Sequence, residues 1–317
     1  MEQVILSFNT IMPLFMVGAL GYVLMRVKVI DQHFVDVGSG LCFKVLLPIL
    51  LFKELYTSKV LDNFNTRLVL FSLGGMVAIL IGCIVLTPMV MKGSSKARIG
   101  AIAHGIYRSN FVFIGLPIME SMFGAEGTAN ALAVLPFAVA LFNVGAVIIF
   151  TIFAPEDSGV EGVSLKKILK SIAKNPLIIA LAIAAAFVIT GIKLPVFLEK
   201  SIVNIGATAT PMALLTLGAQ LDFKAAAKNL KVSGAVTFLR LVVLPGVMVA
   251  LGALVGFRGA ELGLLLILYG APSAVSGFAM AKSMKSDAAL TSEITILTTF
   301  FSTLSLFLGI VAIGFIQ

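Results

Sequence analysis

Long apolar stretches separated by short polar connections run along the whole 317-residue chain. Each stretch holds about 18 or more largely uncharged residues, which is enough for a helix to cross the hydrocarbon core of a bilayer. The pattern predicts ten membrane-spanning helices, so the expected fold class is an all-α polytopic membrane protein. Their ranges are 4–25, 37–55, 67–91, 98–123, 128–153, 173–192, 196–220, 231–256, 259–283 and 289–316.

The composition favours a membrane protein over a soluble one. Hydrophobic residues make up 59% of the chain and charged residues only 12%, and a soluble chain of this length cannot bury so much apolar surface. The net charge of +8 comes from cations scattered over short loops, which argues against a nucleic-acid partner. Cys42 and Cys83 both fall inside predicted spans and are expected to be small apolar fillers, so neither a metal nor a cofactor is expected.

The lysines and arginines of the loops predict the orientation of the chain. The loops after the odd-numbered spans are richer in cations, and cation-rich loops face the cytoplasm. These cations are Arg26, Lys28, Lys92, Lys96, Arg98, Lys166, Lys167, Lys170, Lys174, Lys224, Lys228, Lys231, Lys282 and Lys285. We therefore expect a multi-pass protein of the cell inner or plasma membrane, in contact with the lipid bilayer and with both termini extracytoplasmic. Residues 154–174 then form a cytoplasmic linker between the halves 1–153 and 175–317.

Landmarks recur between the two halves at nearly one spacing. Proline opens the first span and interrupts the second span of each half, and a Ser-Met pair recurs further along. The matched residues are Pro13 with Pro176, Pro48 with Pro211, and Ser121-Met122 with Ser283-Met284. Weak internal symmetry of this kind marks transporter folds. Because five is an odd number, the second half inserts upside down, which predicts two inverted five-helix repeats.

The fourth span of each half carries an interruption. Span four holds Arg108, Ser109 and Asn110 at its centre, and the repeat spacing sends this position to Pro272 and Ser273 in span nine. Irregular backbone at membrane depth is tolerated only where protein or a water-filled cavity satisfies it. The pattern predicts that helices 4 and 9 are broken and cross at the midplane.

Each restarted half-helix would present unpaired N–H groups and the positive end of its dipole. Ser109 or Asn110 suits the cap of the restarted half of span four, and Pro272 suits the first turn in span nine. The spans run in opposite directions, so the two positive ends can converge on one bound anion. A carboxylate fits such a site.

Further polar residues are candidates for the same site. Arg108 either adds positive charge to it or serves the broken helix, by binding its exposed carbonyls or by snorkelling along it. His104, one turn earlier, and Glu293, near the start of span ten, are candidates for a proton relay, although Glu293 also fits an interfacial charge. The remaining substrate-binding candidates are Ser273, Ser276, Asn143 and Pro48. Arg240, inside span eight with no acidic residue one turn away, has no assigned role.

The residues around both interruptions resemble the auxin efflux carrier family of bacterial permeases and plant PIN-FORMED exporters, along essentially the whole chain. "SNFVFIGLPIMESMFG" is similar to the family's crossover in span four, "PSAVSGFAMAK" to its pattern in span nine, and "KNPLI" to the opening of its second half. The matching positions are Asn110, Gly115, Pro117, Pro272, Phe278, Ala281, Lys282, Asn175 and Pro176. Ser109 stands where the family has its first crossover proline.

The resemblance implies ten spans, an extracellular N-terminus and a cytoplasmic mid-chain loop. It also implies a scaffold domain and a transport domain, each drawn from both repeats, with a carboxylate bound near the crossing and helped by spans two and five. The short connection at 154–174 favours a prokaryotic permease over a plant exporter.

The leading functional hypothesis is a secondary transporter for a small organic anion that works by alternating access. A dicarboxylate and an aromatic or aliphatic monocarboxylate are alternatives at this point, and proton or sodium coupling, direction and a homodimer are open. A channel or a transporter-derived sensor is the runner-up. An intramembrane enzyme is disfavoured, because the chain has no HExxH, no GxSxG and no paired intramembrane aspartates.

Overall fold

The computed structural model is helical over the part of the chain that it describes. That part comprises residues 2–57, 65–155, 173–174, 176–220, 229–274 and 276–314, so most of the predicted linker at 154–174 lies outside it. Within these residues six helices are long and apolar enough to cross a membrane, and three apolar helices are shorter. The six are Gln32–Thr57, Thr66–Val90, Leu116–Ile152, Val196–Ala219, Leu230–Val255 and Ala288–Ile313; the shorter ones are Met16–Arg26, Pro176–Thr190 and Gly259–Gly270.

Most observed helix ends lie within a few residues of the predicted ranges. The first half contains α1 (Glu2–Arg26), α2 (Gln32–Leu41), α3 (Leu47–Thr57), α4 (Thr66–Val90), α5 (Lys96–Tyr107) and α6 (Leu116–Ile152). The second half contains α8 (Pro176–Thr190), α9 (Val196–Ala207), α10 (Ala209–Ala219), α11 (Leu230–Phe238), α12 (Leu244–Val255), α13 (Gly259–Gly270), α14 (Ser276–Ser283) and α15 (Ala288–Ile313).

Three wider, π-helical turns have one sequence feature in common. Each is followed at once by Leu-Pro, and the carbonyl four residues before each proline lies inside the turn. The turns are η1 (Cys42–Leu46) before Pro48, η2 (Phe111–Gly115) before Pro117 and η5 (Leu239–Val243) before Pro245. A proline ring crowds the carbonyl four residues earlier and donates no hydrogen bond to it, and a π-turn relieves both problems. The helix through Pro48 is therefore widened and not ended there.

One glycine separates the two predicted spans 98–123 and 128–153. Gly124 has φ 55° and ψ −140°, a conformation that residues with a side chain rarely adopt. The helix turns there and continues as α6 to Ile152. The predicted division between the spans 98–123 and 128–153 therefore falls where the helix kinks, although the connection is shorter than the four residues 124–127 expected from the sequence.

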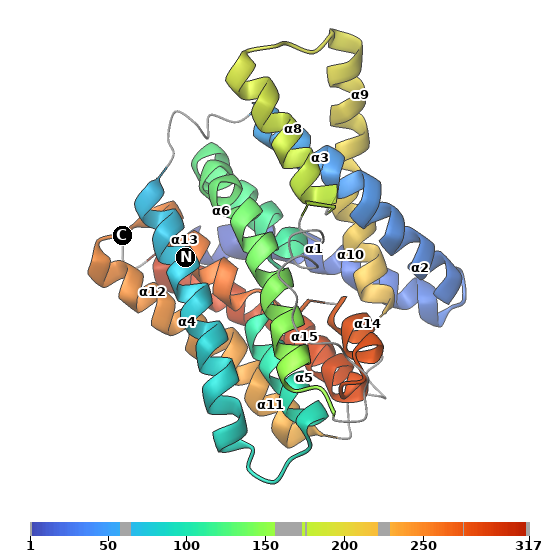
Figure 1. Ribbon diagram of the computed structural model, residues 1–317. Coiled ribbons are helices and arrows are strands. Elements are labelled where there is room, and N and C mark those ends of the chain that lie inside the picture. The colour runs from blue at the N-terminus through green and yellow to red at the C-terminus, as the bar shows by residue number, and fades with distance from the viewer. Residues whose placement is uncertain are drawn as a thin grey trace.

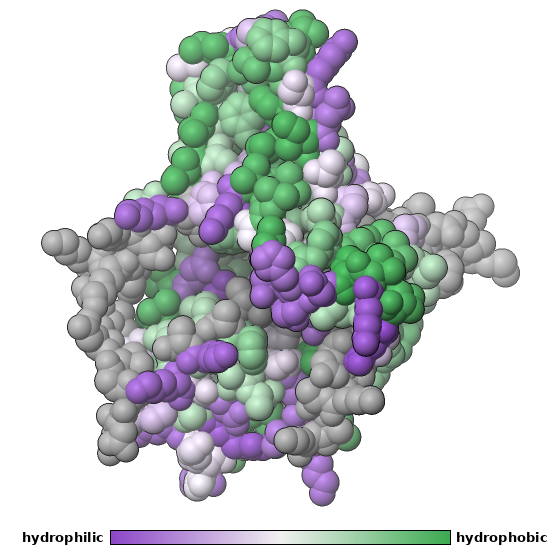
Figure 2. Space-filling model, turned by 90° about the vertical axis from the view of Figure 1, so that its right-hand side faces the viewer, coloured by the Kyte–Doolittle hydropathy of each residue, from purple (hydrophilic) through white to green (hydrophobic). Residues whose placement is uncertain are grey.

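The helices form two groups. The projecting group consists of α1, α2, α3, α8, α9 and α10, of which α3, α8 and α9 stand out at the upper right of Figure 1. The crossing group consists of α4, α5, α6 and α11 to α15, which fill the lower left part of the same view. Apolar residues cover most of the upper projection, whereas hydrophilic residues gather lower on the molecule (Figure 2). Such a surface suits lipid around the projecting helices.

The closest packing inside the projecting group joins α1 of the first half to α10 of the second. Gly21 lies against the backbone of Leu215, and Gly218 lies against the backbone of Gly18, so that a Cβ at either glycine would overlap main-chain atoms. Small residues allow this approach of two helices in a membrane. A second pair that joins the two halves of the chain, α3 with α8, is also in extensive contact.

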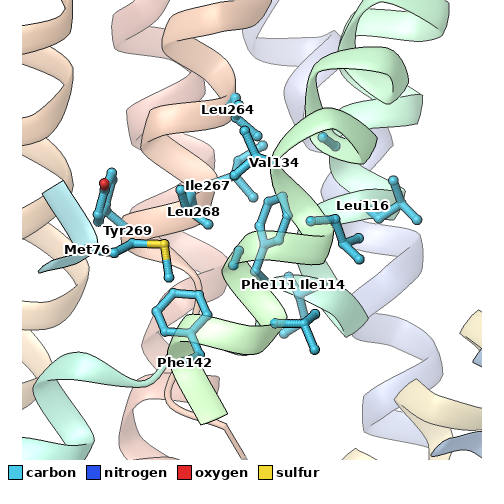
Figure 3. Packing of buried hydrophobic residues seen from close by; sticks show 14 of the residues in the cluster. Met76, Phe111, Ile114, Leu116, Val134, Phe142, Leu264, Ile267, Leu268 and Tyr269 are labelled. Carbon is cyan, nitrogen blue, oxygen red and sulfur yellow. The ribbon is translucent and has the colours of Figure 1, made fainter. Parts of the chain in front are cut away.

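The crossing group has a packed apolar core around η2. Phe111 and Ile114 are almost completely buried, at 1% and 2% exposure, and lie among side chains of α6 and α13 that include Val134 and Ile267 (Figure 3). The ring of Phe111 also fills the space beside Gly115. This core fixes the direction in which the chain leaves the interruption after Tyr107.

Candidate functional site

The two interruptions predicted in the sequence lie side by side. After α5 ends at Tyr107, Arg108 is extended with φ −80° and ψ 115°, and after α13 Ala271 is extended with φ −63° and ψ 148°. Ser109 and Ser273 then form an isolated antiparallel bridge. We refer to residues 108–110 and 271–274 as the crossing.

Two backbone hydrogen bonds join the strands of the crossing. The N–H of Asn110 donates to the carbonyl of Pro272 at 2.8 Å, and the N–H of Ala274 donates to the carbonyl of Arg108 at 3.3 Å. Ser109 and Ser273 are therefore a non-hydrogen-bonded pair, whose Cα atoms are typically about 4.5 Å apart and whose side chains share one face. Both hydroxyl groups are buried and have no hydrogen-bond partner among the described residues.

The predicted capping roles at the crossing are wrong. The side chain of Asn110 makes no capping hydrogen bond to η2, and Ser109 is occupied by the bridge. Pro272 precedes the start of α14 at Ser276 and so is not in its first turn. Asn110 does occupy the position before η2, but only its backbone carbonyl accepts from that turn, at Ile114 N–H, while Ser109 and Pro272 lie in the paired segments outside the helices.

The partners of the Arg108 side chain among the described residues are uncharged. Its Nη2 donates to Asn143 Oδ1 at 2.8 Å, and its Nη1 lies 3.0 Å from Met280 Sδ. Asn143 in turn donates from Nδ2 to the carbonyl of Val139 at 2.9 Å, which directs its oxygen toward the guanidinium. The alternative that Arg108 binds the carbonyls of its own broken helix is not what the structure contains. The side chain is partly exposed, and no carboxylate among the described residues neutralises it.

Arg240, which the sequence left without a role, binds the C-terminal ends of α5 and α13. It is 1% exposed, donates from Nε to the carbonyl of Ala271 at 3.0 Å, and donates from Nη1 to the carbonyls of Ile106 at 2.7 Å and Tyr107 at 3.0 Å. Sequence reasoning missed this residue because it searched for an acidic partner one turn away. An intramembrane arginine in a chain with two broken helices has backbone carbonyls as its available acceptors, and that combination was the usable signal.

Two tyrosines anchor the helix ends that lead into the crossing. Tyr107 closes α5 and donates its hydroxyl to the carbonyl of Leu141 at 2.7 Å, and Tyr269 in the last turn of α13 donates to the carbonyl of Ser72. Both are 1% exposed. A buried tyrosine is held both by the packing of its ring and by the hydrogen bond of its hydroxyl. The two helix ends from which the strands of the crossing start are therefore held in place.

His104 is packed inside the protein. It is 0% exposed, its ring stacks on Phe150 with centroids 4.6 Å apart, and Gly277 of α14 lies directly against it. Neither ring nitrogen has a hydrogen-bond partner among the described residues. The residue therefore does not line an open route in this conformation, and its role as a proton relay stays a prediction.

Glu293 is not exposed to solvent, contrary to what its position near a helix start suggested. It is 2% exposed and accepts hydrogen bonds from the N–H of Asn229 at 2.9 and 3.2 Å, from Asn229 Nδ2 at 3.2 Å and from Ser233 Oγ at 2.8 Å. The carboxylate thus caps the start of α11 from α15. The expectation of an exposed interfacial charge is wrong, because the N-terminus of a second helix covers it.

We expect Glu293→Ala to lower the apparent melting temperature of the purified protein by several degrees. Several donors at the start of α11 lose a buried acceptor, and one unsatisfied buried group costs about 1–3 kcal/mol. Glu293→Gln keeps one acceptor oxygen and should fall between the alanine variant and the wild type. An unchanged melting temperature in the alanine variant would contradict the capping role. Loss of pH dependence in transport by a stable glutamine variant would instead support a proton relay.

The last two candidates are not joined to the crossing by any contact between described side chains. Pro48 lies in the first turn of α3, which packs mainly on α8 and α9. Ser276 begins α14, but its side chain lies outside the described residues. Their roles in binding stay predictions.

A cavity of about 420 Å³ lies where helices of the projecting group meet α14 and α15 of the crossing group. The ends of α1 and α10 contribute Tyr22, Arg26 and Gln220 to its wall, and α14 and α15 contribute Phe278 and Thr295. Thr298, one turn beyond Thr295 on α15, accepts a hydrogen bond from the N–H of Ser273 at 3.1 Å. The cavity therefore reaches to within one helical turn of a residue that contacts the crossing.

Comparison with known proteins decides the family. A family model described as "Membrane transport protein" matches residues 6–310. The chain belongs to the membrane transport protein family. An "uncharacterized transporter" of Methanothermobacter thermautotrophicus is 22% identical and aligns over 95% of this chain and 96% of its own length. A second "uncharacterized transporter", from Methanocaldococcus jannaschii, is 24% identical over 90% of this chain and 92% of its own length.

As a membrane transport protein, the chain is a multi-pass protein of a lipid bilayer with a small-molecule substrate. Its family and the two relatives are described as transporters.

Proposed function

We propose that this membrane transport protein is a secondary transporter for a small organic anion, whose carboxylate binds at the crossing. The observation that carries the proposal is the charge of Arg108. This guanidinium lies at the crossing, is partly exposed, and among the described residues has Asn143 and Met280 as its side-chain partners. The restarted helices add the positive ends of two dipoles. A carboxylate would accept further hydrogen bonds from Arg108 and would supply the negative charge that its described partners do not.

The arrangement of contacts supports an inverted repeat. In such a repeat each contact between the halves has a reciprocal partner, and α1 with α10 and α3 with α8 form one such pair. The bridge between Ser109 and Ser273 likewise joins the two segments that the repeat spacing matches. We infer two five-helix repeats, 1–153 and 175–317, with ten spans in all, both termini extracytoplasmic, and the two broken helices meeting near the midplane.

The division into two groups of helices supports alternating access. The cavity lies between the projecting group, as scaffold, and the crossing group, as transport domain. Arg26 lines it, Lys28 follows the end of α1, and Lys282 lies in the last turn of α14; all three belong to the set of cations expected to face the cytoplasm. This conformation thus corresponds to a state open to the cytoplasm. Movement of one group against the other would close that side and open the opposite one.

A ligand screen followed by a flux assay tests this function. Protein purified in detergent is heated in the presence of monocarboxylates, dicarboxylates and their uncharged amide analogues, because a ligand that binds only the folded state raises its apparent melting temperature. Hits are then tested for uptake into proteoliposomes. We expect carboxylates to stabilise the protein, amides not to, and uptake to saturate at carrier rates. Channel-like conductance, or binding without flux, would overturn the proposal.

The Arg108→Gln variant tests the site. We expect it to lose about ten-fold or more in affinity for the carboxylate hit, because a charge-assisted hydrogen bond contributes about 1.5–3 kcal/mol. Lys193→Gln is the matched control, since it removes an exposed cation in the connection between α8 and α9. Equal affinities for both variants and the wild type would reject the crossing as the binding site.

A further inference from the structure

Three carbonyl groups from two broken helices share one buried guanidinium. We propose that Arg240 is the positioning residue of the crossing: it holds the ends of α5 and α13 together and neutralises their negative dipole ends, so that the site keeps a positive field for an anion. The anion in this proposal rests on the proposed function, whereas the geometry rests on the hydrogen bonds of Arg240.

The contacts of Arg240 connect two segments that are far apart in the sequence. Nη1 binds the carbonyls of Ile106 and Tyr107 on one side, while Nε binds the carbonyl of Ala271 on the other. The carbonyls in the last turn of a helix have no partner within it. At Ile106 this is directly visible, because the N–H of Asn110 that would reach it in a continuing helix donates to Pro272 instead.

The helix that runs through α11, η5 and α12 places Arg240 beside the ends of α5 and α13. Arg240 lies in the π-turn η5, and Pro245 after that turn packs against Gly270, the last residue of α13, where a Cβ would come within 3.2 Å of the proline ring. The helix therefore touches the end of α13 directly. A planar group with five donors in fixed directions can span two helix ends, whereas the single ammonium of a lysine cannot hold the same geometry.

The charges balance at the ends of the helices. Each helix C-terminus corresponds to about half a negative charge, so the ends of α5 and α13 together approach one negative charge, which one guanidinium offsets. Without Arg240 this negative potential would lie within a few residues of Ser109 and Ser273 and would oppose a bound anion. Arg240 itself is 1% exposed and directs three hydrogen bonds to backbone, so it acts on a ligand through the crossing and not by contact.

The two arginines of the crossing therefore have different tasks. Arg108 is partly exposed and donates to an uncharged side chain, as a ligand-binding residue would. Arg240 is buried and donates to backbone carbonyls. We expect Arg108→Gln to weaken anion binding with little change in melting temperature. Arg240→Gln should lower the melting temperature, weaken carboxylate binding by about ten-fold or more, and change the binding of an uncharged amide analogue much less. Arg240→Lys should restore part of the carboxylate affinity.

A ligand-independent measurement separates this proposal from the proposed function. Ser109 and Ser273 form a non-hydrogen-bonded pair, a geometry within the reach of a disulfide. In a background with Cys42→Ala and Cys83→Ala, Ser109→Cys and Ser273→Cys should cross-link readily on oxidation. Adding Arg240→Gln should slow that cross-linking several-fold, because the two strands lose their common anchor. Arg258→Gln is the matched control, since the exposed Arg258 also binds backbone carbonyls, that of Ala253 in the last turn of α12 and that of Phe257 in the connection after it.

The outcomes decide between the two ideas. Cross-linking that slows only with Arg240→Gln supports the positioning role even if no organic anion binds the wild type, in which case only the proposed function fails. If Arg240→Gln leaves the cross-linking rate unchanged, the positioning role is overturned. The same holds if Arg240→Gln weakens the binding of the carboxylate and of its uncharged amide analogue equally. If Arg240→Gln yields no folded protein, Arg240→Lys takes its place in the cross-linking assay with the same criteria.

Discussion

Replacing Gly218 by valine is expected to leave little folded protein in detergent. The Cβ of any side chain at this position would overlap the carbonyl oxygen and carbon of Gly18, and both belong to the backbone of a packed helix that cannot rotate away. Overpacking in a core usually costs about 1–3 kcal/mol, and a clash against main chain on the tightest helix pair should exceed that range. The fraction of monodisperse protein in size-exclusion chromatography, together with the apparent melting temperature, measures the effect.

The control for this variant is a glycine in open surroundings. Gly246 lies in α12 and is exposed, and a Cβ at this residue would have no neighbouring atom within 4 Å, so Gly246→Val should give a normal yield. A yield and melting temperature of Gly218→Val close to those of the control would mean that α1 and α10 are not packed through their backbones.

Asn110→Pro is expected to disrupt the crossing and lower carboxylate affinity by about ten-fold or more. The substitution removes the N–H that donates to Pro272 at 2.8 Å, and an unpaired buried carbonyl costs about 1–3 kcal/mol. The φ angle of Asn110 is −90°, close enough to the value that proline prefers for the ring itself to be tolerated. Thermal unfolding and ligand titration should both respond.

Asn110→Ala separates the backbone of this residue from its side chain. The alanine keeps the N–H, so we expect an unchanged melting temperature but a strongly weakened affinity if the amide side chain contacts the anion. If Asn110→Pro behaved like the alanine variant in both measurements, the bridge would not contribute to stability, and the crossing would have to be maintained by the surrounding helices alone.

The hydrophobic pattern was sufficient to predict where most helices begin and end, because burial in lipid requires long apolar runs whatever the tertiary contacts are. The positions of the interruptions were also predictable, since Arg108 to Asn110 and Pro272 stand out inside such runs. The π-turns were not, because a π-turn and an α-turn leave the same apolar pattern in the sequence. Only the Leu-Pro that follows each of them gives a local sign.

The partners of the polar residues were the least predictable part. Arg240 binds backbone carbonyls of α5, a helix that is more than a hundred positions away in the numbering, and no residue type marks a carbonyl as unpaired. Glu293 looked like a surface charge because it lies near a helix start, but its environment depends on how α11 meets α15. Asn143 could be named as a candidate, yet only the fold reveals that it orients Arg108.

The exchange of partners between the halves has a consequence for how the protein is made. The first half emerges from the ribosome and enters the bilayer before α8 and α10 exist, so α1 and α3 have to wait in lipid without the helices that they later contact most closely. Assembly of the projecting group is thus a late event in biosynthesis, completed only when the second half has been inserted. Until then, the exposed glycine face of α1 is a surface that the insertion machinery or surrounding lipid must cover.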